Sequence, residues 1–448
     1  MSGIAGIAQA GKTNLVETML DKISHRGEAG QKVLDEKTAT MGIVWTEPQA
    51  EAEKSLKKKF EARDQAKSGH LACAKIEDED LVLIRDEIGV APLYQGHNTQ
   101  GILCFASEVK ALIDICTNIK EIPPGSKVVD NQVESYFELE KKKSLADDPD
   151  IIAGELRTRL DESVGKRIEM GGEIGAWLSG GLDSSTMVAL ARPHLDRFPT
   201  FCAGVPGAPD LEFAREVADY IHTDHHEVLV GFQDLLDILP DVIFYLESFD
   251  PLLIRSSLMN FLVAKKASEY VDAVFSGEGG DELFAGYSYL KSIDKKMLAD
   301  ELIDITARLH NTALQRVDRS ASAHGTVAHV GFLDPEVVDY ALRIPVEYKL
   351  RDGIEKWILR KAMQGRLPES VLRRDKAKFW EGAGVEDLIA DHAEKNISDS
   401  EFQNERKLPN GWILNSKEEL MYYRIFKDHF GELRDLSWMG RTKSVTEQ

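Results

Sequence analysis

Two short segments combine glycine, serine and carboxylate residues in patterns that could bind a phosphate group. The first, SGGLDSS, covers residues 179–185 and lies between an apolar run and a helix-like pattern. The second, SGEGGDE, covers residues 276–282 and follows the apolar run DAVF. Glycine lets the backbone approach an anion closely, and hydroxyls and free N–H groups at the start of a helix donate hydrogen bonds to it. Both segments therefore predict a phosphate site at a strand-to-helix turn.

The charged residues of these segments indicate which phosphate chemistry to expect. The first segment lacks the lysine of a Walker A loop, so it is not typical of a kinase-type γ-phosphate site. Its Asp183 would repel a phosphate unless a cation lay between them, and Mg²⁺ is the usual mediator. The second segment adds Glu278, Asp281 and Glu282, which suggest a metal ligand and a proton acceptor. A flexible turn and an acidic helix cap would explain each segment alone but not the pair.

The surrounding pattern predicts the elements that must position these segments. Apolar residues at helical spacing and short β-prone runs alternate after residue 150, which is typical of a parallel sheet with helices on its faces. The expected elements are a helix over 151–168, a strand over 173–178, a helix over 184–195 that ends near Pro193, a strand over 200–205, a helix over 210–221 and a strand over 225–230.

The chain before residue 140 shows a different organisation. It contains short β-prone runs, for example at 80–86 and 101–107, with turn residues nearby. The polar stretch 139–150 predicts a linker, which divides the chain into domains at 1–140 and 150–448. Beyond about Asp294 the pattern is mostly helical.

Composition limits the partners and the location. The chain has 448 residues, 43% of them hydrophobic, and a net charge of −21, which argues against nucleic acid as the main partner. It has no apolar run long enough to span a membrane and no signal-peptide pattern. Its four cysteines form no CxxC pair and show no metal spacing, which fits a reducing compartment. We expect a cytoplasmic protein.

The paired segments resemble the synthetase domain of the asparagine synthetases. The resemblance implies a fold of two kinds, α/β and α+β: an N-terminal layered α/β sandwich like that of the Ntn hydrolases, then a parallel-sheet PP-loop domain with a helical C-terminal part. It extends to further segments in order and spacing, namely SGIAGI, SHRGEAG, RDEIGVAPLY, FASEVKAL, ESFDPLLIRSS, FLDPEVVDYALRIP and RRDKAKFWEGAG.

The resemblance also implies a two-step reaction that uses ATP and Mg²⁺. A carboxylate attacks the α-phosphorus of ATP to give an acyl-adenylate and pyrophosphate, and ammonia then displaces AMP. Glu278 matches the base that accepts the proton from ammonia, and Lys376 matches the lysine that stabilises the phosphoryl transition state. The remaining matches are Ser179, Gly180, Gly181, Asp183, Ser184 and Ser185 for pyrophosphate, Leu178, Ala203, Ser276 and Gly277 for adenosine, and Asp183 and Asp281 for magnesium.

The N-terminal domain departs from the family at its nucleophile. The family begins Met-Cys-Gly-Ile, whereas this chain carries Ser2, a far weaker nucleophile at neutral pH. Whether this serine is natural or engineered stays open. The family's sequence motifs that form the oxyanion hole and bind glutamine are also missing after residue 30. We therefore expect glutamine not to be hydrolysed and the domain to remain as a structural half.

A second departure concerns the carboxylate that is activated. Val327 stands where the family has glutamate, His329 where it has arginine, and Trp380 where it tends to have a small residue. These changes suggest a pocket for an acid other than aspartate, or neutral change around an unchanged pocket. Another carboxylate, an amine-bearing nucleophile and a non-catalytic nucleotide-binding scaffold remain alternatives, while Glu278 favours ammonia over ring closure. A homodimer is left open.

Overall fold

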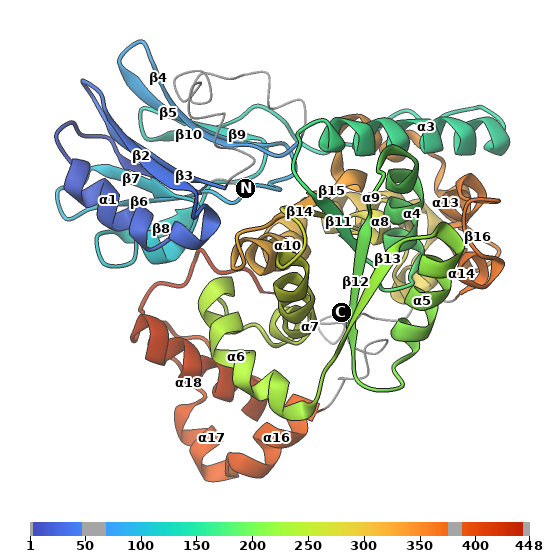
Figure 1. The fold of residues 1–448 in the computed structure, drawn as a ribbon. Coiled ribbons are helices and arrows are strands. Elements are labelled where there is room, and N and C mark those ends of the chain that lie inside the picture. The colour runs from blue at the N-terminus through green and yellow to red at the C-terminus, as the bar shows by residue number, and fades with distance from the viewer. Residues whose placement is uncertain (1–2, 47–68, 375–387, 442–448) are drawn as a thin grey trace.

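A computed structural model describes residues 3–46, 69–374 and 388–441. It is a mixed α/β structure with an N-terminal part of antiparallel sheets and a C-terminal part built on a parallel sheet (Figure 1). The two parts lie against each other, and α3 (Pro149–Ile168) runs along the top of the C-terminal part. The fold class expected from the sequence is therefore confirmed.

The N-terminal part contains two antiparallel sheets. Helix α1 (Thr13–Asp21) packs on the first sheet through Val16, Met19 and Leu20, which are buried. The first sheet has the order β2 (Gly30–Asp35), β3 (Thr40–Trp45), β1 (Gly3–Ile7), β7 (Leu103–Ala106), β6 (Tyr94–His97), β8 (Thr117–Glu121), and the second has the order β10 (Gln132–Ser135), β9 (Ser126–Val129), β5 (Asp80–Arg85), β4 (Ala72–Glu77).

The polar stretch 139–150 connects the two parts and leads into α3. Residues 138–148 form no helix or strand. Asp148 then caps α3 by accepting a hydrogen bond from the Asp150 N–H at 2.8 Å, and Pro149 occupies the first helical position. Both features are typical helix starts, because the cap satisfies a free N–H and proline has none to satisfy.

The parallel sheet has the order β13 (Asp224–Leu229), β12 (Pro199–Gly204), β11 (Ile174–Trp177), β14 (Ala273–Ser276), β15 (Val327–Val330). Helices α4 (Leu182–Ala191) and α5 (Pro209–Ile221) pack on one face, with α3 outside α4. Helices α7 (Pro251–Ser268) and α10 (Ala313–Ser322) pack on the other. These strands and helices agree with the alternation expected from the sequence.

The chain beyond Asp294 is mostly helical, as expected, with short strands as the exceptions. Residues 327–330 form β15, which pairs with β14 and completes the sheet. A four-residue strand has too few residues to show a period, and it forms because β14 offers an open edge. The other elements of the C-terminal part are α6 (Phe232–Leu246), α8 (Gly280–Phe284), α9 (Lys295–Ala307), α11 (Pro335–Arg343), α12 (Val346–Lys349), β16 (Leu350–Arg351), β17 (Ile354–Glu355), α13 (Trp357–Ala362), α14 (Glu369–Arg373), α16 (Leu388–Asn396), α17 (Asp399–Glu405) and α18 (Lys417–Phe430).

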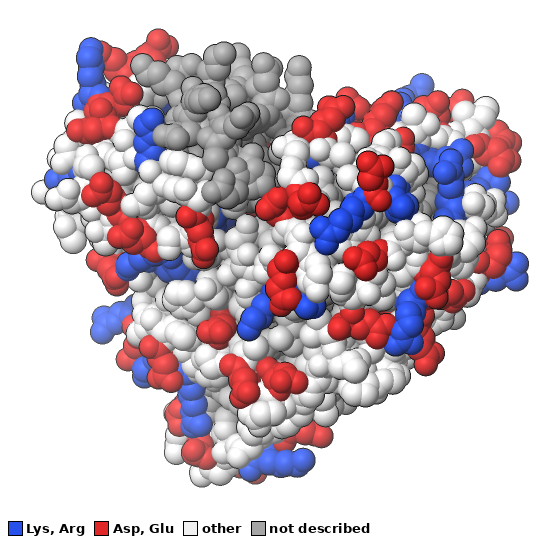
Figure 2. Space-filling model, in the orientation of Figure 1, with Lys and Arg blue, Asp and Glu red and all other residues white. Residues whose placement is uncertain are grey.

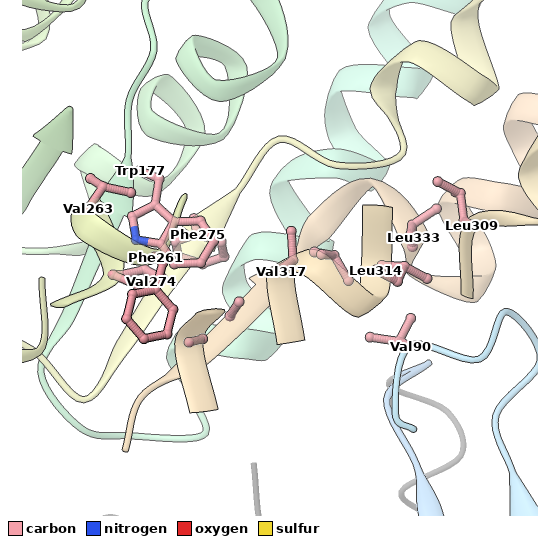
Figure 3. Close-up of a cluster of buried hydrophobic side chains, with 14 of the residues drawn as sticks. Val90, Trp177, Phe261, Val263, Val274, Phe275, Leu309, Leu314, Val317 and Leu333 are labelled. Carbon is pink, nitrogen blue, oxygen red and sulfur yellow. The ribbon is translucent and has the colours of Figure 1, made fainter. Parts of the chain in front are cut away.

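One hydrophobic cluster joins the two parts. It runs from Trp177 and Phe275, beside the parallel sheet, to Val90 on the N-terminal ribbon (Figure 3). The N-terminal sheets also enclose a smaller cluster of their own around Phe105 and Leu83. The shared cluster means that the two parts bury apolar surface against each other, which is the main favourable term in such packing.

Charged residues of both signs are interspersed over the face of the molecule that Figure 2 shows. None of the helices in the described parts of the chain combines the length and the apolar surface that a bilayer crossing would need.

Candidate active site

Two loops lie at the carboxyl edge of the parallel sheet, one after β11 and one after β14. These strands are neighbours, with Ala176 opposite Phe275 in the register. The strand order reverses between them, because the chain runs from β11 outward to β13 and returns to add β14 on the other side. Open parallel sheets bind ligands at such a point, outside the carboxyl ends of the strands.

The first loop is a turn that opens onto the start of α4. The Ser179 and Ser184 hydroxyls lie 3.1 Å apart, and Ser184 Oγ donates to the Gly181 carbonyl at 3.2 Å. Gly180 has φ +68°, and a Cβ there would lie 2.4 Å from Phe213 Cβ. Glycine is therefore required, and the turn brings the free N–H groups and the positive end of α4 to the edge of the sheet.

The second loop packs directly on the first through glycines. A Cβ on Gly277 would lie 2.7 Å from the Ser184 nitrogen and 2.9 Å from the Asp183 carbonyl carbon. A Cβ on Gly280 would lie 2.5 Å from Asp183 Cγ. The missing side chains let the start of α8 approach the start of α4, so both loops border one site.

Asp183 and Asp281 meet at one buried cation, Lys356. The Lys356 ammonium lies 2.5 Å from Asp281 Oδ1 and also pairs with Asp183. Lys356 is 2% exposed, caps α13 and has φ +54°. Gly286 makes room for the pair, because a Cβ there would lie 2.0 Å from Asp281 Oδ1 and 2.3 Å from Lys356 Cε. The two carboxylates can thus share one cation.

This arrangement fits a magnesium-bound phosphate. Mg²⁺ is usually held by one or two carboxylates together with phosphate oxygens and waters. Among the described residues, no cluster of three or more His, Cys, Asp and Glu side chains could hold a metal by itself. Asp183 and Asp281 would supply the protein ligands, and the N–H groups of the glycine loops would receive the phosphate oxygens.

Glu278 lies in the second loop and is held by Arg316 of α10. The Arg316 guanidinium donates to a Glu278 carboxylate oxygen, and the two side chains are 13% and 21% exposed. A carboxylate in contact with solvent and fixed by one arginine keeps a lone pair for a reacting proton. This geometry suits a general base at the edge of the phosphate site.

Glu282 differs from its neighbours because it is fully buried. Burial, with Asp281 nearby, raises the pKa of Glu282 to about 8. The Tyr287 hydroxyl donates a hydrogen bond to it. Its burial and this hydrogen bond indicate that Glu282 supports the start of α8.

Comparison with known proteins places the chain in a family. A model of the asparagine synthase family matches residues 155–304 and 294–446, and a glutamine amidotransferase domain model matches 68–147. The chain belongs to the asparagine synthase family. It is 37% identical to an asparagine synthetase of Arabidopsis thaliana over 79% of its own length, and 35% identical to asparagine synthetase B of Escherichia coli over the same share.

The chain spans about two thirds of the length of these relatives. It covers 65% of the plant protein and 68% of the bacterial one. Among solved structures, the NMN synthetase of Francisella tularensis aligns with 64% of this chain and 97% of its own, at 10% identity and a TM-score of 0.30. A score this low does not establish a shared fold.

Most of the predicted site residues lie at one edge of the parallel sheet, the carboxyl edge. Leu178 follows β11 directly, and its N–H donates to the Phe201 carbonyl of β12 at 2.8 Å. Ala203 lies on β12, and Ser276 ends β14. Ser185 is buried in the first turn of α4. These positions lie in or beside the two loops.

Two predicted pocket residues lie on β15, the edge strand next to β14. Val327 is at the opposite, amino end of β15, where it pairs with Ala273. His329 is 4% exposed and its ring lies 5.6 Å from that of Phe275, centre to centre. Burial holds the pKa of His329 well below its usual value, with Arg167 adding to the effect. Ser2, Lys376 and Trp380 lie outside the described residues.

Three cations of the site escaped prediction from the sequence. Lys356, Arg316 and Arg374 lie on helices and turns far along the chain from the loops that they contact. Arg374 donates to the Ser179 carbonyl at 3.4 Å and pairs with Asp210 at 2.5 Å. Nothing in the spacing of these residues signals the contact, because tertiary packing alone creates it.

Proposed function

We propose that this protein is an ATP-dependent amide synthetase that activates a carboxylate as an acyl-adenylate and aminates it with ammonia. The proposal rests on one observation: the two glycine-rich loops pack on each other. This packing brings Asp183, Asp281 and Glu278 together at one edge of the sheet. Membership of the asparagine synthase family makes aspartate the first acceptor to test, with another small carboxylic acid as the alternative.

In the first step, the acceptor carboxylate attacks the α-phosphorus of ATP and the bond to the bridging oxygen of pyrophosphate breaks. The N–H groups and hydroxyls around Ser179 and Ser184 would hold the leaving pyrophosphate, as preorganised donors stabilise developing charge. Magnesium, when bound by Asp183 and Asp281, supplies positive charge to the phosphate oxygens. Lys356 would keep the two carboxylates together, and Lys376 is the proposed contact to the reacting phosphorus.

In the second step, ammonia attacks the acyl carbon, and AMP leaves with the electrons of the broken C–O bond. The nitrogen must lose a proton, and Glu278 is the proposed acceptor. Arg316 would hold the Glu278 carboxylate toward the acyl carbon. Glutamate at this position favours external ammonia over an internal amine.

The nitrogen source in this proposal is free ammonia. Ser2 replaces the family's cysteine, and the glutamine amidotransferase model matches only residues 68–147 of this chain. We propose domains at 1–140 and 150–448, the first a structural half. His329 and Trp380 remain candidates for setting which acid is accepted. Val327 is set aside, because it lies at the amino end of β15, away from the two loops.

Pyrophosphate exchange tests the two steps separately. The protein, Mg²⁺, ATP and labelled pyrophosphate are mixed with aspartate or with each of a panel of carboxylic acids. A supporting result is exchange with one acid, and amide and AMP formation when ammonium is added. Glu278→Gln should keep the exchange and lose the amide. If no acid supports exchange, a nucleotide-binding scaffold replaces the proposal.

A further inference from the structure

One helix, α10, contacts both the N-terminal part and the proposed base. Its residue Arg316 binds Glu278, as described above. One turn later, Asp318 and Arg319 point into the interface with the N-terminal part and are 6% and 1% exposed. The helix therefore connects the interface to the site over a few residues.

The interface contact is made by Arg26 from the N-terminal part. Its Nη1 and Nη2 donate to the two Asp318 oxygens at 2.9 and 2.7 Å, and Nη1 also donates to Ser322 Oγ at 3.1 Å. Arg26 is 1% exposed. A two-pronged guanidinium–carboxylate pair fixes orientation as well as distance, so this contact sets the rotation of α10.

A second set of buried ion pairs closes the same contact. Arg319 of α10 lies 2.9 Å from Glu108 of the N-terminal part and 3.1 Å from Glu247 at the end of α6. Glu247 in turn accepts hydrogen bonds from the Val109 and Lys110 N–H groups at 3.0 and 2.6 Å. The cations Arg26, Lys110 and Arg319 thus face an equal number of carboxylates, Glu108, Glu247 and Asp318.

The buried ion pairs of this interface are better suited to orienting α10 than to stabilising the fold. Burial alone raises the pKa of Glu108, but the neighbouring cations, Arg319 foremost, hold that pKa well below its usual value. Buried ion pairs are weak contributors to stability compared with well-packed apolar groups. At an interface that already shares a hydrophobic cluster, such directional pairs are suited to fixing one arrangement of α10.

We propose that the N-terminal part positions the amination base: the contact of Arg26 with Asp318, together with that of Arg319 with Glu108, holds α10 so that its Arg316 keeps the Glu278 carboxylate in place. Arg26, Asp318 and Arg319 are positioning residues in this scheme. The inference rests on the proposed function, because Glu278 acts only in its second step. It gives the N-terminal part a use that does not need glutamine hydrolysis.

The test is a charge-balanced double variant, Arg26→Met/Asp318→Asn, which removes one cation and one carboxylate together. We expect its kcat for ammonium-dependent amide formation to fall about tenfold, with pyrophosphate exchange changed less than about twofold. Arg26→Lys keeps the charge without the two-pronged contact and should give an intermediate kcat. Hydrogen exchange of the α10 amides should accelerate in the double variant.

The matched control is Arg167→Met/Asp334→Asn, a buried ion pair that joins α3 to the residue before α11 at 3.1 Å. We expect this control either to lower pyrophosphate exchange and amide formation by similar factors or to leave both unchanged. If the double variant at Arg26 folds and lowers exchange and amination equally, or lowers neither, the positioning role is wrong. If the parent protein shows no exchange with any acid, the proposed function has failed instead, and this outcome is separate.

Discussion

Lys356 and Asp183 form a buried ion pair although 173 residues separate them in the sequence. The same ammonium pairs with Asp281, so one lysine joins the carboxylates of both glycine loops. The loop of the first carboxylate carries no lysine of its own, and its cationic partner comes from the residue just before α13. Removal of this lysine would leave two carboxylates facing each other in a site with little water.

Lys356→Met should therefore destabilise the metal-free protein. Removing one partner of a buried ion pair typically costs about 3–5 kcal/mol of unfolding free energy. Adding MgCl₂ and ATP should raise the melting temperature of the variant by more than that of the parent, because the ion replaces the lost positive charge. Lys361→Met is the control, since Lys361 lies on the same helix but pairs with the exposed Asp150. Equal melting temperatures of parent and Lys356→Met would contradict the assignment.

Gly277→Ala should weaken ATP binding without unfolding the protein. The new Cβ would press on the Ser184 nitrogen and the Asp183 carbonyl carbon, both of them backbone atoms that cannot rotate away. We expect the Kd for ATP, measured by calorimetry, to rise at least about tenfold, which corresponds to about 1.4 kcal/mol. In Gly165→Ala, on α3, the Cβ meets no atom within 4 Å. That control should keep the Kd and gain a little stability, because alanine favours a helix over glycine.

Acid should destabilise the protein below neutral pH through two histidines whose pKa is lowered in the folded state. Burial lowers the pKa of His225 and of His324 to about 4, so both are neutral in the folded state when the unfolded chain protonates them. The unfolded state then binds more protons between pH 6.5 and about 4, and stability falls as the pH falls through this range. The melting temperature measured from pH 7 to 4.5 should show this slope.

The variant His324→Gln isolates one of these groups. Its melting temperature should depend less on pH between 6.5 and 4.5 than that of the parent, whatever the change at pH 7. His97→Gln is a control at a half-buried histidine of β6. A slope in His324→Gln as steep as in the parent would show that this histidine does not couple folding to protons.

Glutamine should not replace ammonium as the nitrogen source. The chain carries serine in place of the cysteine nucleophile, and a hydroxyl is little ionised at neutral pH compared with a thiol of pKa about 8.5. We expect no glutamate release from glutamine by the purified protein, and no change in glutaminase activity when Ser2 is replaced by alanine. Restoring the cysteine alone, Ser2→Cys, should not restore hydrolysis, because the strings for the oxyanion hole and the glutamine clamp are also missing. Release of glutamate at a rate matching amide formation would overturn this prediction.

The sequence by itself determined the two glycine-rich segments proposed to bind phosphate and the alternation of strands and helices around them. These signals are local: glycine is needed at Gly180 for its φ, and apolar periods define α3 and α5. Local backbone preference and burial period are written into neighbouring residues, so they can be seen without the fold.

Only the tertiary structure decided which cations serve these segments. Lys356, Arg316 and Arg26 each contact a residue that the chain places far away, and no spacing predicts such pairs. The same holds for β15, whose four residues become a strand only at the open edge of β14. Long-range charge pairing depends on which surfaces the folded elements bring together, and that choice is made by the packing of the whole core.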